Sequence, residues 1–266
     1  MKEIQGIFGI MPVLKSLVTS GIHRAVGDLG WAALRMRIGR LGKPSYYDYL
    51  TNLIMQRAER SPGSVWIDVG AHKGDILIEM LTSAPEAEFL AFEPIPKFYQ
   101  ILKDQFSGSN VHVFNLALSD HSGEVSFNFV TTNPGYSGFK QREYPSEAET
   151  TEEIFVKTET LDSIMQNMNL GKVNFIKIDV EGAELEVLSG SIETLRCDKP
   201  IVVFEHGLGA ADYYKTRPEQ VFELFSSCGL RVSSLSGFLR KRRSFTRDEF
   251  AKIFYNHIDY YFVAHP

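Results

Sequence analysis

Hydrophobic and polar positions from residue 45 onward alternate between short apolar runs and segments with helical spacing. The apolar runs predict strands, and the segments between them predict helices. A repeating strand–helix order is typical of a parallel sheet with helices on both faces, so we expect an α/β fold. The predicted strands are 64–69, 88–93, 111–116, 174–179, 201–205, 230–235 and 259–263, and the predicted helices are 75–82, 97–106, 183–189, 218–228 and 246–255.

The alternation is interrupted in the middle of the chain. Residues 124–130 and 154–158 have the pattern of strands, and the polar stretch between them contains Asn133-Pro134-Gly135 and Ser137-Gly138. Because glycine and proline at such positions mark turns, this segment predicts an inserted hairpin or a lid.

The first 43 residues form a separate basic segment, with seven Lys and Arg against two acidic residues. Apolar residues recur there every three or four positions, which predicts an amphipathic helix. Pro12 and Lys15 interrupt the apolar run, which is shorter than the about 18 to 20 residues of a bilayer crossing. We therefore expect a helical extension over 1–43, acting as a cap, as a homodimer contact or as an interfacial helix on an anionic membrane. Residues 44–266 then form a second domain.

Composition narrows the class of protein. A net charge of −5 and a pI near 5.8 give no overall reason to expect binding to nucleic acid. Cys197 and Cys228 are too few for a disulfide framework, and no signal peptide is evident, so we expect a cytoplasmic protein.

The segment V-W-I-D-V-G-A-H-K-G-D, residues 65–75, passes from a predicted strand directly into a helix. Gly70 and Gly74 allow a tight turn and a close approach of the backbone to a ligand. In dinucleotide-binding enzymes such a helix start receives a phosphate, but Asp68 would repel one and favours a cation such as the sulfonium of S-adenosylmethionine. The third glycine of the dinucleotide fingerprint is also absent.

Two further predicted strand ends favour a nucleoside. Glu93 closes the next strand in A-F-E-P, where a carboxylate can accept both hydrogen bonds of a ribose diol. The stretch N-L-A-L-S-D, residues 115–120, follows the third strand and offers backbone groups to an adenine edge, although a simple Asx or Ser turn explains it equally well.

Acidic residues also cluster after the later strands. Asp179 and Glu181 follow the strand F-I-K-I-D, while Glu205 and His206 end the strand I-V-V-F-E-H. Ligands bind open α/β sheets in the crevice beyond the carboxyl ends of the strands, so these side chains are candidates for contact with a substrate. His206 or a carboxylate can act as a base, and the three acids can alternatively hold Mg²⁺. Glu184 and Glu186 are explained by the first turns of a helix.

In their order and spacing, the motifs D-V-G-A-x-x-G-D, F-E-P, N-x-A-L-S-D, T-L-D-S and I-K-I-D-V-E-G-A-E-L-E-V-L-S-G resemble those of FkbM-type methyltransferases over residues 60–206. The resemblance implies a Rossmann-like class I methyltransferase sheet of seven strands, a cytosolic location and methyl transfer to a hydroxyl of a sugar, cyclitol or polyketide-like acceptor. His72 departs from the family, which more often has Asn there.

Together these observations predict two groups of site residues. The residues expected to hold S-adenosylmethionine are Asp68, Gly70, Ala71, Gly74, Asp75, Glu93, Pro94, Asn115, Ala117, Leu118 and Asp179. The residues expected to face the acceptor are Asp179, Glu181, Glu205 and His206.

Two other readings of the site stay open, a non-catalytic module that binds a nucleoside and a nicotinamide-dependent oxidoreductase. The basic run Arg240–Arg243, followed by Arg247, is either a solvated loop or a site for an anionic acceptor such as a phosphorylated sugar.

Overall fold

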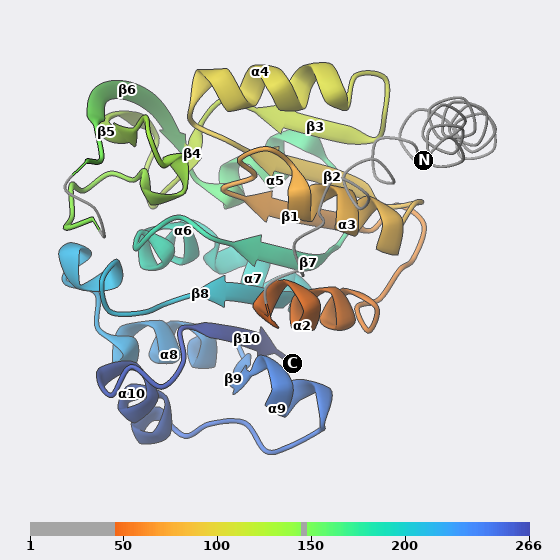
Figure 1. Cartoon of the computed structure of the whole chain (residues 1–266). Coiled ribbons are helices and arrows are strands. Elements are labelled where there is room, and N and C mark those ends of the chain that lie inside the picture. Colours follow the sequence, from red (N-terminus) through yellow and green to blue (C-terminus); the bar gives the residue numbers. More distant parts are fainter. Residues whose placement is uncertain (1–45, 145–147) are drawn as a thin grey trace, which may run out of the picture. The chain divides into compact units, whose positions relative to one another are not determined.

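The computed structural model describes residues 46–144 and 148–266 (Figure 1). The predicted extension over residues 1–43, with its membrane or homodimer contact, lies outside the described residues. Within the described part of the chain, no helix is long and apolar enough to cross a membrane.

A seven-stranded sheet forms the centre of the domain, with the strand order β3-β2-β1-β7-β8-β10-β9. The pairings among β3, β2, β1, β7 and β8 are parallel, whereas β10 runs antiparallel to both of its neighbours. The predicted fold class, a Rossmann-like α/β sheet with mostly parallel strands, is therefore confirmed. The strands are β1 (Val65–Val69), β2 (Glu88–Phe92), β3 (Val111–Phe114), β7 (Val173–Ile178), β8 (Ile201–Glu205), β9 (Arg231–Ser234) and β10 (Tyr261–His265).

Helices cover both faces of this sheet, as right-handed connections between parallel strands require (Figure 1). In one group of helices, α2 contacts α3 and α9. In another, α8 contacts α6 and α10, and α5 contacts α7. The helices are α2 (Tyr46–Met55), α3 (Asp75–Ser83), α4 (Pro96–Gln105), α5 (Leu161–Met168), α6 (Glu184–Ser189), α7 (Ile192–Asp198), α8 (Pro218–Ser227), α9 (Leu235–Leu239) and α10 (Arg247–Tyr255).

Four of these helices, α2, α5, α7 and α9, were not predicted. The T-L-D-S motif contains the start signal of α5, because the hydroxyl of Thr160 accepts a hydrogen bond from the backbone N–H of Ser163 at 3.2 Å. This is an N-cap, which satisfies one of the donors left free in the first turn of a helix.

The predicted inserted hairpin is confirmed. Strands β5 (Gly123–Val130) and β6 (Thr151–Glu159) pair antiparallel, and β4 (Ala117–Leu118) adds to β6 to give a three-stranded sheet of its own. The short 3₁₀ helix η1 (Pro134–Tyr136) lies in the connection, where the hydroxyl of Ser137 accepts a hydrogen bond from the backbone N–H of Val130 at 3.0 Å. The insertion follows β3 in the chain and lies beside the carboxyl ends of β1 and β7 (Figure 1).

Strands β1 and β7 are buried at every position, as expected for central parallel strands covered on both faces. Trp66 and Phe175 stack between them with ring centroids 5.0 Å apart. The last residues of the two strands, Val69 and Ile178, lie side by side, and the site is built at those ends.

Candidate active site

The register of the sheet brings the ends of four strands to one edge. Val69 pairs with Phe92 of β2 and with Ile178 of β7, and Ile178 pairs in turn with Phe204 of β8. The residues that follow these positions are Gly70, Glu93, Asp179 and Glu205. Residues up to 135 positions apart in sequence, Gly70 and Glu205, therefore lie on the same edge.

Beyond this edge lies a cavity of about 220 Å³, here called the inner cavity. Its wall combines a few polar groups with apolar side chains that can enclose a flat ring, among them Phe92, Ile95, Leu118, Phe127 and Phe139. Six of the residues predicted to hold the cofactor line it, namely Gly70, Glu93, Pro94, Ala117, Leu118 and Asp179.

Glu93 is the acidic group of the cofactor side of the inner cavity. Its Oε2 accepts a hydrogen bond from the backbone N–H of His72 at 2.7 Å, and its Oε1 accepts one from the N–H of Ile95 at 2.8 Å. Burial raises the pKa of Glu93 to about 7, although both hydrogen bonds act in the opposite direction. Each oxygen keeps a second lone pair, so the carboxylate can also accept hydrogen bonds from a diol.

Asp68 lies below the turn and does not line the inner cavity. It is buried, and its Oδ2 has no hydrogen-bond partner among the described residues. Burial raises the pKa of Asp68 to about 7, against the attraction of the Lys177 ammonium. An unpartnered buried carboxyl group beneath the turn fits a site that receives a positively charged ligand.

The turn after β1 requires glycine for a steric reason. Gly70 has a φ of 81°, and a Cβ atom on it would lie 2.0 Å from the carbonyl oxygen of Asp179. A side chain at this position would push β1 and β7 apart. Gly70 also lines the inner cavity.

Four predicted cofactor residues support the site without lining it. The side-chain amide of Asn115 donates hydrogen bonds to the carbonyl oxygens of Glu93 at 3.0 Å and Pro94 at 2.9 Å, so it holds the loop after β2 in place. Ala71 is buried in the turn, while Gly74 caps α3 and Asp75 begins it.

Three carboxyl groups lie together at the mouth of the inner cavity. Oxygen atoms of Asp179, Glu181 and Glu205 all lie within 4.8 Å of one another. We call these three residues the carboxyl cluster. The sequence analysis predicted all three as acceptor-side residues, and the structure brings them together.

Two groups that the sequence analysis missed hold Asp179 in place. Its Oδ2 accepts a hydrogen bond from the Lys177 ammonium at 2.9 Å and one from the Tyr261 hydroxyl at 2.6 Å. Lys177 precedes Asp179 by two positions on a buried strand, so period-two alternation places both on one face and gave a usable signal. Tyr261 comes from β10, and no local pattern links it to Asp179.

The protonation of the carboxyl cluster follows from these contacts. Burial alone would raise the pKa of Asp179, but the Lys177 ammonium and the hydrogen bonds from Tyr261, Lys177 and Glu205 bring it below its usual value. Burial and the negative charge of Asp179 raise the pKa of Glu205 to about 10 and that of Glu181 to about 8. Near pH 7, Asp179 is therefore the carboxylate and Glu205 carries a proton.

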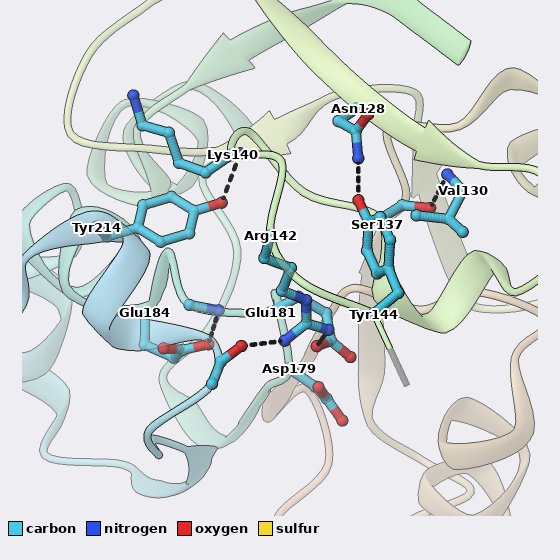
Figure 2. Close-up of polar contacts among 12 residues, drawn as sticks. Asn128, Val130, Ser137, Lys140, Arg142, Tyr144, Asp179, Glu181, Glu184 and Tyr214 are labelled. Atoms are coloured by element: carbon cyan, nitrogen blue, oxygen red, sulfur yellow. Dashed lines mark hydrogen bonds and ion pairs between the residues drawn. The ribbon is translucent and has the colours of Figure 1, made fainter. Parts of the chain in front are cut away.

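The insertion reaches the carboxyl cluster through Arg142, which Figure 2 shows directed at Glu181. The guanidinium pairs with the carboxylate of Glu181, and its Nη1 donates a hydrogen bond to the carbonyl oxygen of Gly209 at 3.0 Å. Nearby, the Tyr214 hydroxyl accepts a hydrogen bond from the backbone N–H of Lys140 at 3.2 Å (Figure 2). The sequence analysis did not identify Arg142, because nothing in its local pattern indicates a contact 39 residues away.

A second cavity of about 600 Å³, here called the outer cavity, opens on the other side of the carboxyl cluster. Glu205 and Arg142 form part of its wall, together with residues 207–213 and 257–260 at several positions. The carboxyl cluster therefore lies between two cavities, with Asp179 and Glu181 on the inner one and Glu205 on the outer one.

His206 does not lie where the sequence analysis placed it. Its side chain is fully buried, and its ring stacks on Phe254 with centroids 4.8 Å apart. The Oε2 of Glu184, another buried residue, lies 3.8 Å from Nδ1 of His206. His206 lines neither cavity, so it cannot meet an acceptor in this structure.

The basic run Arg240–Arg243 also lies away from the site. The chain after it pairs with β9 where the N–H of Phe245 donates to the carbonyl oxygen of Val232 at 2.8 Å. Val232 pairs with Ala264, which in turn pairs with Val202 near the amino end of β8. Glu205 is at the carboxyl end of β8, so the basic run lies near the end of the strands opposite to the site. Neither cavity is lined by any residue of the run, and the Arg243 guanidinium bonds Glu249.

Comparison with known proteins gives one family and several relatives. The model of the methyltransferase FkbM domain matches residues 68–232. The methyltransferase sdnD of Sordaria araneosa is 30% identical over 47% of this chain and 59% of its own length. The 2-O-methyltransferase NoeI of Sinorhizobium fredii is 26% identical over 50% of this chain and 60% of its own. The hexuronic acid methyltransferase AglP of Haloferax volcanii is 28% identical over 63% of this chain and 66% of its own length. This chain matches less than two thirds of the length of each.

Proposed function

This chain belongs to the FkbM methyltransferase family, and we propose that it transfers a methyl group from S-adenosylmethionine to a hydroxyl of a sugar-like acceptor. The observation that carries the proposal is the position of the carboxyl cluster between two cavities. The inner cavity suits a nucleoside, and the outer cavity leaves room for an acceptor.

The inner cavity fits S-adenosylmethionine by the chemistry of its wall. Glu93 accepts hydrogen bonds from the ribose hydroxyls, and the apolar side chains enclose the adenine ring. Gly70 lines the cavity with backbone atoms alone, while the Asp179 carboxylate in its wall favours the positive charge of the cofactor. When bound, this cofactor supplies an electrophilic methyl group on a sulfonium.

On the acceptor side, Asp179 receives the proton of the acceptor hydroxyl. It is the member of the carboxyl cluster whose pKa is lowered, because Lys177 and Tyr261 stabilise its charge. Glu205 carries a proton, so it orients Asp179 through their hydrogen bond. The rest of the catalysis consists of holding the hydroxyl in line with the transferred group.

A hydroxyl of a sugar-like ring is the acceptor that two observations support. Two of the relatives have names that describe a 2-O-methyltransferase and a hexuronic acid methyltransferase. Four tyrosines, Tyr136, Tyr144, Tyr213 and Tyr260, line the outer cavity, and aromatic side chains suit the flat C–H face of a sugar.

We further propose that Lys177 and Arg142, rather than Mg²⁺, balance the charge of the carboxyl cluster. Both cations already bond its members. An ion placed there would have to displace the Lys177 ammonium from Asp179 or compete with it at close range. Turnover is therefore expected to continue in EDTA, and loss of activity that added Mg²⁺ restores would contradict this part of the proposal.

The test separates three kinds of protein. Thermal shifts with S-adenosylmethionine, S-adenosylhomocysteine and NAD distinguish a methyltransferase from a nicotinamide-dependent oxidoreductase. Acceptor-dependent formation of S-adenosylhomocysteine over a panel of glycosides then distinguishes an enzyme from a binding module. Asp179→Asn is expected to lower turnover by about 100-fold or more, the scale of a general base. Stabilisation by NAD alone, or cofactor binding without turnover on any acceptor, would refute the proposal.

A further inference from the structure

The outer cavity is assembled from three separate parts of the chain. The insertion contributes Arg142–Tyr144, the loop after β8 contributes Gly207–Tyr213, and the segment before β10 contributes His257–Tyr260 at several positions. Hydrogen bonds join these parts. The Tyr213 hydroxyl accepts one from the N–H of Glu143 at 3.0 Å, and the N–H of His206, at the start of the loop after β8, donates one to the carbonyl oxygen of Tyr260 at 2.7 Å. The cavity is therefore a built feature of the fold.

Its charged groups are mainly acidic. Glu143, Asp212 and Asp259 line it in addition to the protonated Glu205. The arginine in its wall is Arg142, whose guanidinium is already paired with Glu181 and with a backbone carbonyl. The remaining basic side chain there is that of His257. A ligand in the cavity thus meets an excess of negative charge.

Backbone N–H groups hold the carboxylates of two of these acids, Asp212 and Asp259, in place. The Asp212 Oδ1 accepts a hydrogen bond from the N–H of Gly209 at 2.6 Å. The Asp259 Oδ1 accepts hydrogen bonds from the N–H groups of Tyr260 at 2.9 Å and Tyr261 at 3.3 Å. These carboxylates cannot easily turn away from an approaching anion, so their repulsion acts on whatever enters.

From this combination of aromatic and acidic walls we infer that the outer cavity selects a hydroxylated ring without negative charge. Neutral sugars and amino sugars are accepted, whereas uronic acids and phosphorylated sugars are disfavoured. This inference rests on the proposed function, and it replaces the anionic acceptor that the basic run Arg240–Arg243 had suggested. Aromatic faces pack against the apolar side of the ring, and an amino group gains attraction from both the carboxylates and the tyrosine faces.

The experiment uses three glycosides that differ in one substituent. Methyl glucoside, methyl glucosaminide and methyl glucuronide are compared as acceptors of the chain of residues 1–266 by kcat/KM at low salt. In parallel, their binding is measured by calorimetry in the presence of S-adenosylhomocysteine. The kcat/KM for the glucuronide is expected to be about 10-fold or more below that for the glucoside. This difference in kcat/KM should become smaller at high salt, because exposed charges are screened.

A charge-neutralising variant locates the effect. Glu143→Gln combined with Asp212→Asn is expected to lower the ratio of kcat/KM for the glucoside to kcat/KM for the glucuronide by about 5-fold at low salt. The control Glu86→Gln combined with Glu124→Gln removes the same charge at exposed positions outside both cavities, and its ratio should stay that of the unmodified chain.

The outcomes separate this inference from the function it rests on. Methyl transfer to the glucuronide at least as fast as to the glucoside, or a ratio that Glu143→Gln with Asp212→Asn leaves unchanged, overturns the charge selection while supporting a methyltransferase. Absence of binding by all three glycosides at millimolar concentration overturns the sugar-like ring. Binding in the expected order without any methyl transfer supports the selection and refutes the proposed activity.

Discussion

Lys177 and Asp179 form a buried ion pair whose two members are unequally exposed, and this asymmetry predicts the cost of removing each. The Lys177 side chain is 4% exposed and that of Asp179 is 31% exposed. Lys177→Met leaves a carboxylate that water can still reach, whereas Asp179→Asn leaves a buried ammonium without its carboxylate. We expect losses in the free energy of unfolding of about 2 kcal/mol and about 3 to 4 kcal/mol, respectively.

The double variant makes the prediction specific to the pair. With Met at 177 and Asn at 179, no charge is left unpaired, so the combined loss should be about 2 kcal/mol rather than the sum of the single losses. Urea unfolding monitored by circular dichroism gives the three values. The control Arg196→Met removes an exposed pair with Glu193 and should cost at most about 0.5 kcal/mol.

The pH dependence of the Lys177→Met loss provides a second check. In the unmodified chain the pKa of Asp179 is lowered, so its stabilising effect is present above its unfolded-state pKa and is lost as pH falls through the folded-state value. Without the ammonium, we expect burial, the largest influence, to outweigh the hydrogen bonds from Tyr261 and Glu205 and to raise that pKa, so that Asp179 destabilises the fold at neutral pH. The difference between variant and unmodified chain should therefore shrink as the pH falls from 7.5 to 5.

Two results would refute this reasoning. If the loss in the free energy of unfolding of the double variant equals the sum of the two single-variant losses, Lys177 and Asp179 do not interact energetically. A Lys177→Met loss that stays constant or grows between pH 7.5 and pH 5 would mean that the carboxylate does not depend on the ammonium.

Two further predictions concern the inner cavity. Glu93→Ala should weaken S-adenosylmethionine binding by roughly 1.5 to 3 kcal/mol in calorimetry, the scale of charge-assisted hydrogen bonds, and wild-type affinity in a folded variant would remove Glu93 from the cofactor site. Gly70→Ala places a Cβ atom 2.0 Å from a carbonyl oxygen, whereas Gly63→Ala, at a similar positive φ, has nothing within 4 Å. Thermal unfolding should thus show about 1 to 2 kcal/mol of loss at Gly63 and clearly more at Gly70, and equal losses would contradict the steric argument.

Much of the site could be predicted because its residues follow strands that the local pattern reveals. Gly70, Glu93, Asp179 and Glu205 each come directly after an apolar run, and parallel strands bring such positions to one edge of a sheet. The order and spacing of the motifs also indicated the family, which the match over residues 68–232 confirms. Strand ends are a local property, so the sequence alone carried this information.

His206 shows where the same reasoning fails. It follows Glu205 directly, and from the pattern both belong to the rim. The side chain instead turns toward Phe250 and Phe254, because α10 packs against this part of the sheet and its aromatic residues surround the imidazole. Which of two adjacent residues faces the cavity depends on a helix about 45 residues later in the chain.

By itself, the sequence determined the α/β fold, the edge at which the site forms and the acidic groups gathered there, because all three follow from hydrophobic periodicity and from turn residues close to one another in the chain. Only the tertiary structure decided which charges neutralise those acids. Lys177 acts together with Tyr261 from the last strand, Arg142 arrives from the insertion, and the basic run lies at the opposite edge of the sheet. Electrostatic energies depend on distances of a few ångströms between residues far apart in sequence, and those distances exist only once the strands and the insertion have packed.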